Sequence, residues 1–182
     1  MPSTGFINAT STQAYSFYTQ WAAPRNIKRC NGTYATGDYL EFLGIKFDIQ
    51  SVGNIPVNST VDGFEMNVTG RRNSGSPSIF HWLSKDGVNL STTNFNYAWT
   101  STTPSTQTFG GATNDWGFGP PPIKITSGIA IYAIIGNFAA SSAADYDCVQ
   151  INTHYTLAPN PPNSYIFKSG NYGFKSGNSI YK

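Results

Sequence analysis

Charged residues are scarce in this chain. Only 11% of its 182 residues are Asp, Glu, Lys or Arg, and the formal net charge is +2, whereas ordinary soluble domains carry about 25% charged residues. A small positive surplus does not form the clustered Lys and Arg surface that binds phosphate backbones. We therefore predict no nucleic-acid partner. Neutral hydrogen-bonding side chains, chiefly Ser, Thr and Asn, must supply most of the polarity.

Side chains that could act as catalytic bases are equally few. The chain has two histidines, His81 and His154, and two glutamates, Glu41 and Glu65. Nucleophilic catalysis needs a Ser or Cys beside a base, and glycoside hydrolysis needs two carboxylates across a cleft. No nucleophile elbow, Walker loop or dinucleotide fingerprint occurs in the sequence. We predict no enzyme and no cofactor, and we interpret both histidines as ordinary sheet residues.

Long apolar runs and clustered cysteines are also missing. No stretch approaches the ~18 apolar residues of a membrane span, and the N-terminus lacks a basic region followed by an apolar segment. We expect no membrane partner and synthesis in a cytoplasm. Cys30 and Cys148 are the only cysteines, without a His or Cys at metal-ligand spacing. A disulfide between them is one alternative, but two buried thiols are favoured in a protein made without export.

The chain is rich in aromatic residues, at 15%, and in short stretches of strand-forming residues separated by turn residues. This pattern predicts an all-β antiparallel β-sandwich of the jelly-roll type with a short C-terminal β-repeat arm. Gly44 marks a candidate bulge, and Asp86-Gly87 predicts a hairpin turn. We expect strands at residues 15–21, 39–49, 61–71, 79–83, 88–90, 95–99, 106–109, 123–125, 129–135 and 146–155.

The composition changes after residue 157. Residues 158–163 contain three prolines, which have no amide proton to donate to a sheet, so this segment is predicted to be a stiff linker. We therefore divide the chain into a jelly-roll body at 1–157, the linker at 158–163 and an arm at 164–182. The arm has three lysines and no acid, which leaves the rest of the chain with eight basic and nine acidic residues, a net charge of −1.

The arm is a seven-residue repeat. Residues 165–171 and 172–178 are two copies of a four-residue strand followed by Ser-Gly-Asn, and 179–182 is a partial copy. So short a segment cannot bury its own rings. It folds back on the body, stays partly disordered, or docks on another chain. We favour docking by strand addition to an open sheet edge, using the aromatic and basic residues Tyr165, Phe167, Lys168, Tyr172, Phe174, Lys175 and Tyr181.

Several motifs near the end of the body support a more specific interpretation. They are Asn114-Asp115-Trp116-Gly117, the proline corner Pro120-Pro121-Pro122, the apolar run at 129–135 and the closing strand at 145–155. In this order they resemble the closing segments of a jelly-roll module that recurs in structural proteins of tailed-bacteriophage particles. The resemblance extends over most of residues 20–156. The chain departs from that module at Tyr146-Asp147-Cys148-Val149 and at the proline corner, so loop-borne functions do not transfer.

The resemblance implies a non-enzymatic virion structural protein, such as a capsid decoration, adaptor or fibre component. Such a protein would be made in the host bacterial cytoplasm and then reside in the virion. Its partners would be other virion proteins of the capsid, neck or tail, which it would join through the C-terminal arm. It would form a homo-oligomer, for example a trimer.

The alternative function is a host-receptor or glycan-binding module at a tail or head fibre. Exposed aromatic rings among neutral polar residues suit a cell-surface glycan, and Tyr97, Trp99 and Trp116 are the candidates, although Trp in a sandwich is more often part of the core. Asp145 and Asp147 lie on the same side of a strand and are weak candidates for a calcium site. We favour two acids that solvate a loop, and we predict no metal.

Overall fold

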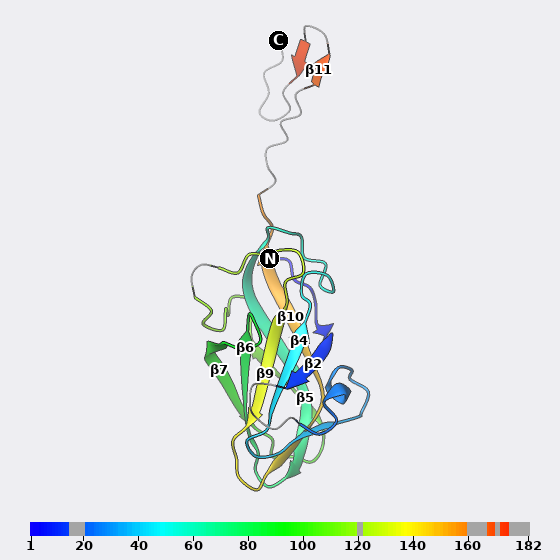
Figure 1. Ribbon diagram of the computed structural model, residues 1–182, viewed down its shortest axis with the longest axis vertical. Coiled ribbons are helices and arrows are strands. Elements are labelled where there is room, and N and C mark those ends of the chain that lie inside the picture. Colours follow the sequence, from blue (N-terminus) through cyan, green and yellow to red (C-terminus); the bar gives the residue numbers. More distant parts are fainter. Residues whose placement is uncertain (15–20, 120–121, 160–166, 170–171, 175–182) are drawn as a thin grey trace.

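The computed structural model describes residues 1–14, 21–119, 122–159, 167–169 and 172–174. Its body consists of two five-stranded sheets whose strands all pair antiparallel, which confirms the predicted β-sandwich (Figure 1). A 3-10 helix, η1 (Pro24–Ile27), precedes β3. Sheet A contains β1 (Ile7–Asn8), β3 (Ala35–Gly37), β5 (Thr60–Ser74), β8 (Ser105–Gly110) and β10 (Ala143–Thr156); sheet B contains β2 (Ser11–Ala14), β4 (Phe42–Phe47), β6 (Ser78–Ser84), β7 (Leu90–Ala98) and β9 (Ile131–Asn137).

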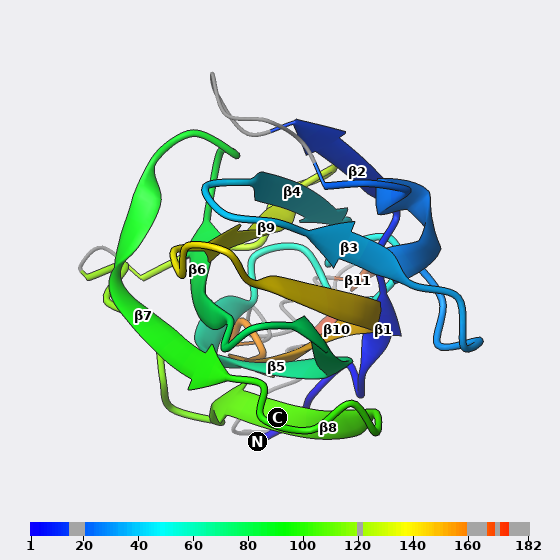
Figure 2. The same cartoon turned by 90° about the horizontal axis from the view of Figure 1, so that it is seen from below.

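Sheet A is organised around the long pair β5 and β10. Its order is β1-β10-β5-β8, with β3 pairing to the other part of β10. Alternation along β5 buries Phe64, Met66 and Val68 in the core, as the sequence pattern predicts, because successive side chains of a strand point to opposite faces. Glu65 and Asn67 therefore face outward. Figure 2 shows β8 at the outer margin of this sheet.

Sheet B has the order β2-β4-β9-β6-β7. Strands β6 and β7 form the hairpin that Asp86-Gly87 predicts. The Asp86 carboxylate accepts the backbone N–H groups of Val88 and Asn89, each at 2.8 Å. These hydrogen bonds hold the pKa of Asp86 well below its ordinary value. Because the backbone N–H group of Val88 bonds to Asp86 within the loop, β7 begins at Leu90 and not at residue 88, where the sequence places it.

The core lies between the two sheets and contains a satisfied polar network. The Tyr146 hydroxyl lies 2.7 Å from His81 Nε2 and accepts a hydrogen bond from Trp99 Nε1 at 3.1 Å. His81 Nδ1 lies 3.1 Å from the Phe95 carbonyl oxygen and donates to it. Every polar atom of the His81 ring therefore has a partner, as buried polar groups require. The predicted role of His81 as an ordinary sheet residue agrees with this arrangement.

Cys30 and Cys148 form a disulfide, so the expectation of two free thiols is wrong. The segment after η1 runs beside β10, where Lys28 and Cys148 form an isolated antiparallel bridge. This contact brings the two cysteine Cα atoms to 4.9 Å, within the normal span of a disulfide. The sequence separation of 118 residues gave no sign of this proximity.

Other sequence-based expectations for the strands also need correction. Strand β4 begins at Phe42 and not at residue 39, because Leu40 adopts a left-handed conformation with φ of 58°. Gly44 marks no bulge, since β4 pairs in continuous register with β2 and β9. Residues 123–125 form only an isolated bridge through Lys124. Strand β2 was not predicted, and the strand expected at 15–21 lies outside the described residues except for Trp21.

The described part of the arm is a small hairpin of its own. Strands β11 (Phe167–Ser169) and β12 (Tyr172–Phe174) pair antiparallel as a separate two-stranded sheet. Each copy of the repeat thus contains a strand, as the sequence predicts, but Ser169 lies in β11 and not in the predicted turn. Tyr165, Lys175 and Tyr181, together with most of the linker, lie outside the described residues. No helical turn in the described chain has the length and apolar character needed to cross a bilayer.

Candidate functional site

Strand β6 presents apolar side chains on both of its faces. Its inward residues Ile79, His81 and Leu83 are buried against the core. The alternate residues Phe80 and Trp82 point to the outer face of sheet B and are only partly buried. Contiguous apolar surface on the outer face of a sheet often marks a site of interaction with another molecule.

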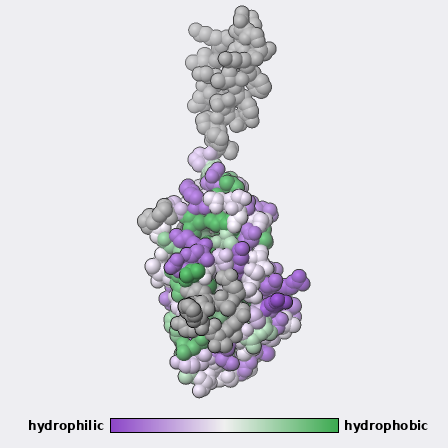
Figure 3. Space-filling model, viewed as in Figure 1, coloured by the Kyte–Doolittle hydropathy of each residue, from purple (hydrophilic) through white to green (hydrophobic). Residues whose placement is uncertain are grey.

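Phe80, Trp82 and Phe138 form a compact aromatic cluster, here called the aromatic face. The rings of Phe80 and Trp82 are stacked, with centroids 5.6 Å apart and an interplanar angle of 19°. Phe138 stands nearly perpendicular to them, with centroid distances of 5.2 Å to Phe80 and 5.9 Å to Trp82. Its side chain is 41% exposed. Figure 3 views the body from the side of β4, β9 and β6 and shows hydrophobic residues among polar ones.

The register of sheet B explains why this cluster can form. Phe80 lies opposite Gly136 on β9, and Gly136 lies opposite Phe42 on β4. A Cβ atom on Gly136 would lie 2.5 Å from Phe42 Cε1, so only glycine leaves room for the Phe42 ring. That ring then contacts Phe138 edge to face, with centroids 5.2 Å apart. The cluster is thus fixed by regular strand pairing and by one glycine.

Amide side chains border the aromatic face on the side of β7. Asn96 lies opposite Phe80, and Asn94 lies opposite Trp82, and both amides are exposed. Directly opposite residues of an antiparallel pair are close enough for their side chains to contact one ligand. Asn96 accepts a hydrogen bond from the Ser78 hydroxyl at 3.1 Å through Oδ1. That hydrogen bond fixes the orientation of the Asn96 amide, including its NH₂ group.

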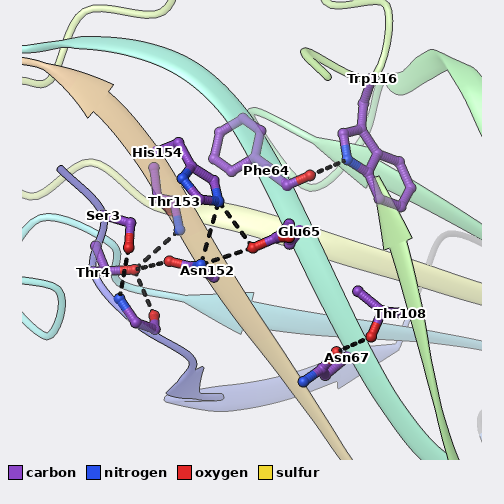
Figure 4. Close-up of polar contacts among 11 residues, drawn as sticks. Ser3, Thr4, Phe64, Glu65, Asn67, Thr108, Trp116, Asn152, Thr153 and His154 are labelled. Carbon is purple, nitrogen blue, oxygen red and sulfur yellow. Dashed lines mark hydrogen bonds and ion pairs between the residues drawn. The ribbon is translucent and has the colours of Figure 1, made fainter. Parts of the chain in front are cut away.

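The outer face of sheet A is polar and largely bonded to itself (Figure 4). Asn152 donates to Glu65 Oε2 at 2.8 Å, and His154 Nε2 lies 2.9 Å from the same oxygen. The hydrogen bond from His154 is the main cause that lowers the pKa of Glu65 below its ordinary value. Further along the sheet, the Thr108 hydroxyl donates to Asn67 Oδ1 at 2.6 Å. His154 is a sheet residue, as expected.

The two weak calcium candidates have internal partners. Asp145 accepts hydrogen bonds from Arg71 Nε at 3.0 Å and from Asn73 and Thr36. Asp147 accepts the backbone N–H groups of residues 31 and 32 at 3.0 and 2.8 Å. Within the described ranges no group of three or more His, Cys, Asp or Glu residues could hold a metal ion. The carboxylates therefore serve to fix the chain around β10.

The predicted glycan-binding residues face inward, which corrects that expectation. Trp99 is 2% exposed and Trp116 is completely buried. Trp116 Nε1 donates to the Phe64 carbonyl oxygen at 3.0 Å, and Tyr97 packs against the core beside Trp99, with ring centroids 4.8 Å apart. Neither indole offers a ring face to a ligand. Their burial follows the general tendency of Trp in a sandwich, which the sequence analysis noted.

A groove of about 470 Å³ lies at the end of the body where β5 begins. Phe118 and the carboxylates of Asp62 and Asp115 line it. The Asp62 carboxylate already accepts a hydrogen bond from the Thr156 hydroxyl at 2.9 Å, and Lys85 Nζ lies 5.1 Å from the Phe118 ring centroid. The groove is a second place where a small polar ligand could contact an aromatic ring.

Sequence reasoning did not select Phe42, Phe80, Trp82 or Phe138 as site residues. The available signal was the middle of β6, residues 79–83, in which both sets of alternate residues are large and apolar or aromatic. A half-buried strand normally alternates apolar and polar residues. Apolar residues on both faces therefore indicate a strand whose outer face also makes contacts.

Comparisons with known proteins do not identify a family. No protein-family model matches the sequence. No curated protein matches it either. The chain is similar in structure to the cyclase FisC from Fischerella sp. TAU, with 14% sequence identity and a TM-score of 0.45 over 86% of this chain and 85% of that one.

The chain is also similar to TmCBM61, solved in complex with β-1,4-galactotriose, with 10% identity and a TM-score of 0.41 over 78% of this chain and 86% of that one. A third similar structure is the CBM22-1 xylan-binding domain of Xyn10C from Paenibacillus barcinonensis, with 10% identity and a TM-score of 0.38 over 83% of this chain and 99% of that one. With identities and TM-scores this low, none of these likenesses identifies a function.

Proposed function

We propose that this protein is a non-enzymatic binding protein of a tailed-phage particle. In this proposal the aromatic face recognises a cell-surface carbohydrate, and the C-terminal arm joins the protein to a neighbouring protein subunit of the virion. The observation that carries the carbohydrate part is the outward cluster of Phe80, Trp82 and Phe138 beside the exposed amides of Asn94 and Asn96. The particle part rests on the sequence resemblance over residues 20–156.

The chemistry of the aromatic face suits a neutral, hydroxyl-rich ligand. A sugar ring has apolar C–H faces that pack on aromatic rings, and hydroxyl groups that need amide donors and acceptors at the rim. The outward positions of β6 and β7 that form this surface, Phe80, Trp82, Asn94 and Asn96, carry no charge. An ionic ligand would need an opposite charge there. Rigid aromatic contacts also cost little conformational entropy on binding.

The arm supports attachment to a protein partner. The hairpin of β11 and β12 is a separate two-stranded sheet, and a hairpin of that size is marginally stable in water unless it packs on something else. A partner that supplies a further strand or surface would stabilise it. The proposed location of the protein is therefore the virion, with the body displayed and the arm docked.

A glycan array with the whole protein tests the carbohydrate part. We expect reproducible binding to a restricted set of glycans, and Trp82→Ala should weaken that binding at least about tenfold, because buried aromatic contacts dominate binding energies. Phe6→Ala is the matched control. Phe6 is also an exposed aromatic residue, at 40%, but it lies next to β1 in sheet A, so its loss should leave binding unchanged.

Phe118→Ala separates the aromatic face from the groove at the end of the body. Weakened binding in Phe118→Ala, with normal binding in Trp82→Ala, would move the site to the groove lined by Asp62 and Asp115. No binding by the wild-type protein to any glycan of the phage host's surface would contradict the proposal. Circular dichroism and thermal unfolding verify that each variant is folded.

A further inference from the structure

The outer edge of β8 has unpaired backbone groups. In the described chain β8 pairs with β5 alone, with Met66 opposite Phe109 and Asn67 opposite Thr108. The N–H group of Gly111 donates to the Phe64 carbonyl oxygen at 3.0 Å, whereas the Phe64 N–H group donates to the Asn114 carbonyl oxygen. The bond from Gly111 places residues 64 and 111 at the position of a hydrogen-bonded pair. Such pairs alternate along an antiparallel ladder. The backbone groups of Phe109 and Gln107 therefore point to β5, and those of Thr106, Thr108 and Gly110 point away from it.

This edge lacks the usual protection against pairing with another chain. Exposed edge strands normally carry Lys, Pro or a bulge. Strand β8 reads Ser-Thr-Gln-Thr-Phe-Gly, without a charge or a proline, and it pairs with β5 in continuous register. The edge of β7 differs, because the N–H group of Thr93 donates to the Trp116 carbonyl oxygen, and the Thr92 hydroxyl donates to the Gly117 carbonyl oxygen. Of these two edges, β8 is therefore the open one.

Among the described residues of the arm, the only strands are those of one two-stranded hairpin. Strands β11 and β12 pair with each other, so each of them has a second row of backbone groups along its outer side. Two strands alone are marginally stable, whereas three or more are stable when a face is covered. The arm carries three lysines and the rest of the chain a net −1, which favours their encounter.

We propose that the β11–β12 hairpin of one copy adds to the open edge of β8 in a second copy of this chain. The added strand would exchange hydrogen bonds with Thr106, Thr108 and Gly110, as in other cases of strand addition. This inference deepens the assembly part of the proposed function by naming the docking surface, and it is independent of the aromatic face. The arm and the β8 edge are different surfaces, so the contact is heterologous. In a closed ring of copies, or in a reciprocal exchange between two copies, every arm would be docked on a β8 edge.

The course of the chain favours a second copy over the arm's own body. Strand β10 ends at Thr156, opposite Thr60, whereas the nearest end of β8, Gly110, lies opposite Glu65. Five residues of strand correspond to roughly 16 Å, so the arm would have to reverse direction and run back by that distance. The sequence of the linker, with three prolines in six residues, predicts a stiff segment that does not favour such a reversal.

The test is a pair of substitutions at one residue of β8. Thr108→Pro removes the N–H group that points away from β5 and keeps every β5–β8 hydrogen bond, since proline is tolerated at such edge positions. Thr108→Ala is the matched control, because it also loses the hydroxyl contact with Asn67 but retains the N–H group. In sedimentation equilibrium we expect the wild type and Thr108→Ala to self-associate. In Thr108→Pro the association constant should be lower by at least about tenfold.

A mixing experiment distinguishes exchange between copies from folding back. A full-length arm variant, Phe167→Pro with Phe174→Pro, has an intact β8 edge but no pairing strands, so it should not self-associate. Mixed with Thr108→Pro, which has a normal arm, it should form a complex, because one variant supplies the arm and the other supplies the edge. A mixture that stays monomeric, or a wild type that is monomeric, would overturn the proposal.

Two further measurements keep the result interpretable. Thr106→Pro with Thr106→Ala repeats the comparison at the neighbouring outward position if Thr108→Pro does not fold. Equal self-association of the Pro and Ala variants at both positions would rule out the β8 edge. Glycan binding measured on the same samples should be unchanged in every variant, so a failure of the edge proposal does not resemble a failure of the aromatic face.

Discussion

The outer faces of the two sheets differ in how their side chains are satisfied. On sheet A, Glu65, Asn152 and His154 bond to one another, and Asn67 bonds to Thr108. On sheet B, the aromatic rings of Phe80, Trp82 and Phe138 contact each other but remain partly exposed. Polar groups that are paired within the protein have little left for a ligand. Aromatic surface that is still in water has free energy to gain on binding.

This difference assigns separate tasks to the two faces. The bonds of sheet A stabilise the fold, and the Cys30–Cys148 disulfide adds a covalent tie on the same sheet, at β10. Under the proposed function, the aromatic rings of sheet B contribute less to the fold than to a contact with a carbohydrate. Substitutions on sheet A should therefore lower stability, and those on sheet B should lower binding. The effects below test this division.

The largest effect is expected from Cys30→Ser combined with Cys148→Ser. The disulfide closes a loop of 118 residues, and a cross-link over so long a loop stabilises a protein by about 5 kcal/mol in the chain-entropy account. We expect a loss of that size in urea unfolding, and the same loss when the wild type is unfolded with a reductant. An equal free energy of unfolding with and without reductant would show that the Cys30–Cys148 disulfide does not stabilise the fold.

The two histidines provide the second test, because one faces the core from sheet B and the other lies on the outer face of sheet A. Burial lowers the pKa of His81 from 6.5 to about 4. Between pH 6.5 and about pH 4, His81 is therefore protonated in the unfolded chain but neutral in the folded chain. The free energy of unfolding falls as the pH is lowered through this interval. Between pH 7 and pH 5 we expect a loss of about 2 kcal/mol.

His154→Gln and His81→Gln are the variants for this measurement, followed by urea unfolding at each pH. His154→Gln should keep the pH dependence that His81 causes, since it leaves the buried His81 ring and its partners unchanged. His81→Gln should start from a lower stability and lose most of the pH dependence. Carboxylates with lowered pKa values, such as Glu65, lose their contribution only at more acidic pH, so they do not disturb the interval chosen. An unchanged slope in His81→Gln would contradict this account.

The fold could be predicted from the sequence because it depends on local patterns. Alternation in β5 and the turn at Asp86-Gly87 each specify a strand or a hairpin without knowledge of the rest of the chain. The start of β4 was misplaced because the left-handed conformation of Leu40 has no signature in a residue with a branched side chain. The Cys30–Cys148 pairing depends on a contact between distant segments, which no local pattern reports.

The candidate site was harder to predict than the fold. Trp99 and Trp116 were chosen because of their residue type, but whether an aromatic ring faces the core or the solvent depends on strand register. Phe138 contacts Phe80 only because β9 and β6 are neighbours in sheet B. The order of strands in a sheet is a property of the whole chain. For that reason the residue types were recognised, and their grouping was not.

The smallest effects are expected from a matched pair of asparagines, one on each face. Asn67 on sheet A accepts a hydrogen bond from Thr108 at 2.6 Å, so Asn67→Ala should lower the free energy of unfolding by about 0.5–1 kcal/mol, the net worth of one such bond. Asn94 lies opposite Trp82 and is exposed, so Asn94→Ala should leave stability within about 0.5 kcal/mol of the wild type. Its effect should instead be weaker glycan binding, measured by titration calorimetry. If Asn67→Ala weakened glycan binding and Asn94→Ala did not, the binding face would be the outer face of sheet A. The polar side chains of that face would then contact the ligand as well as one another.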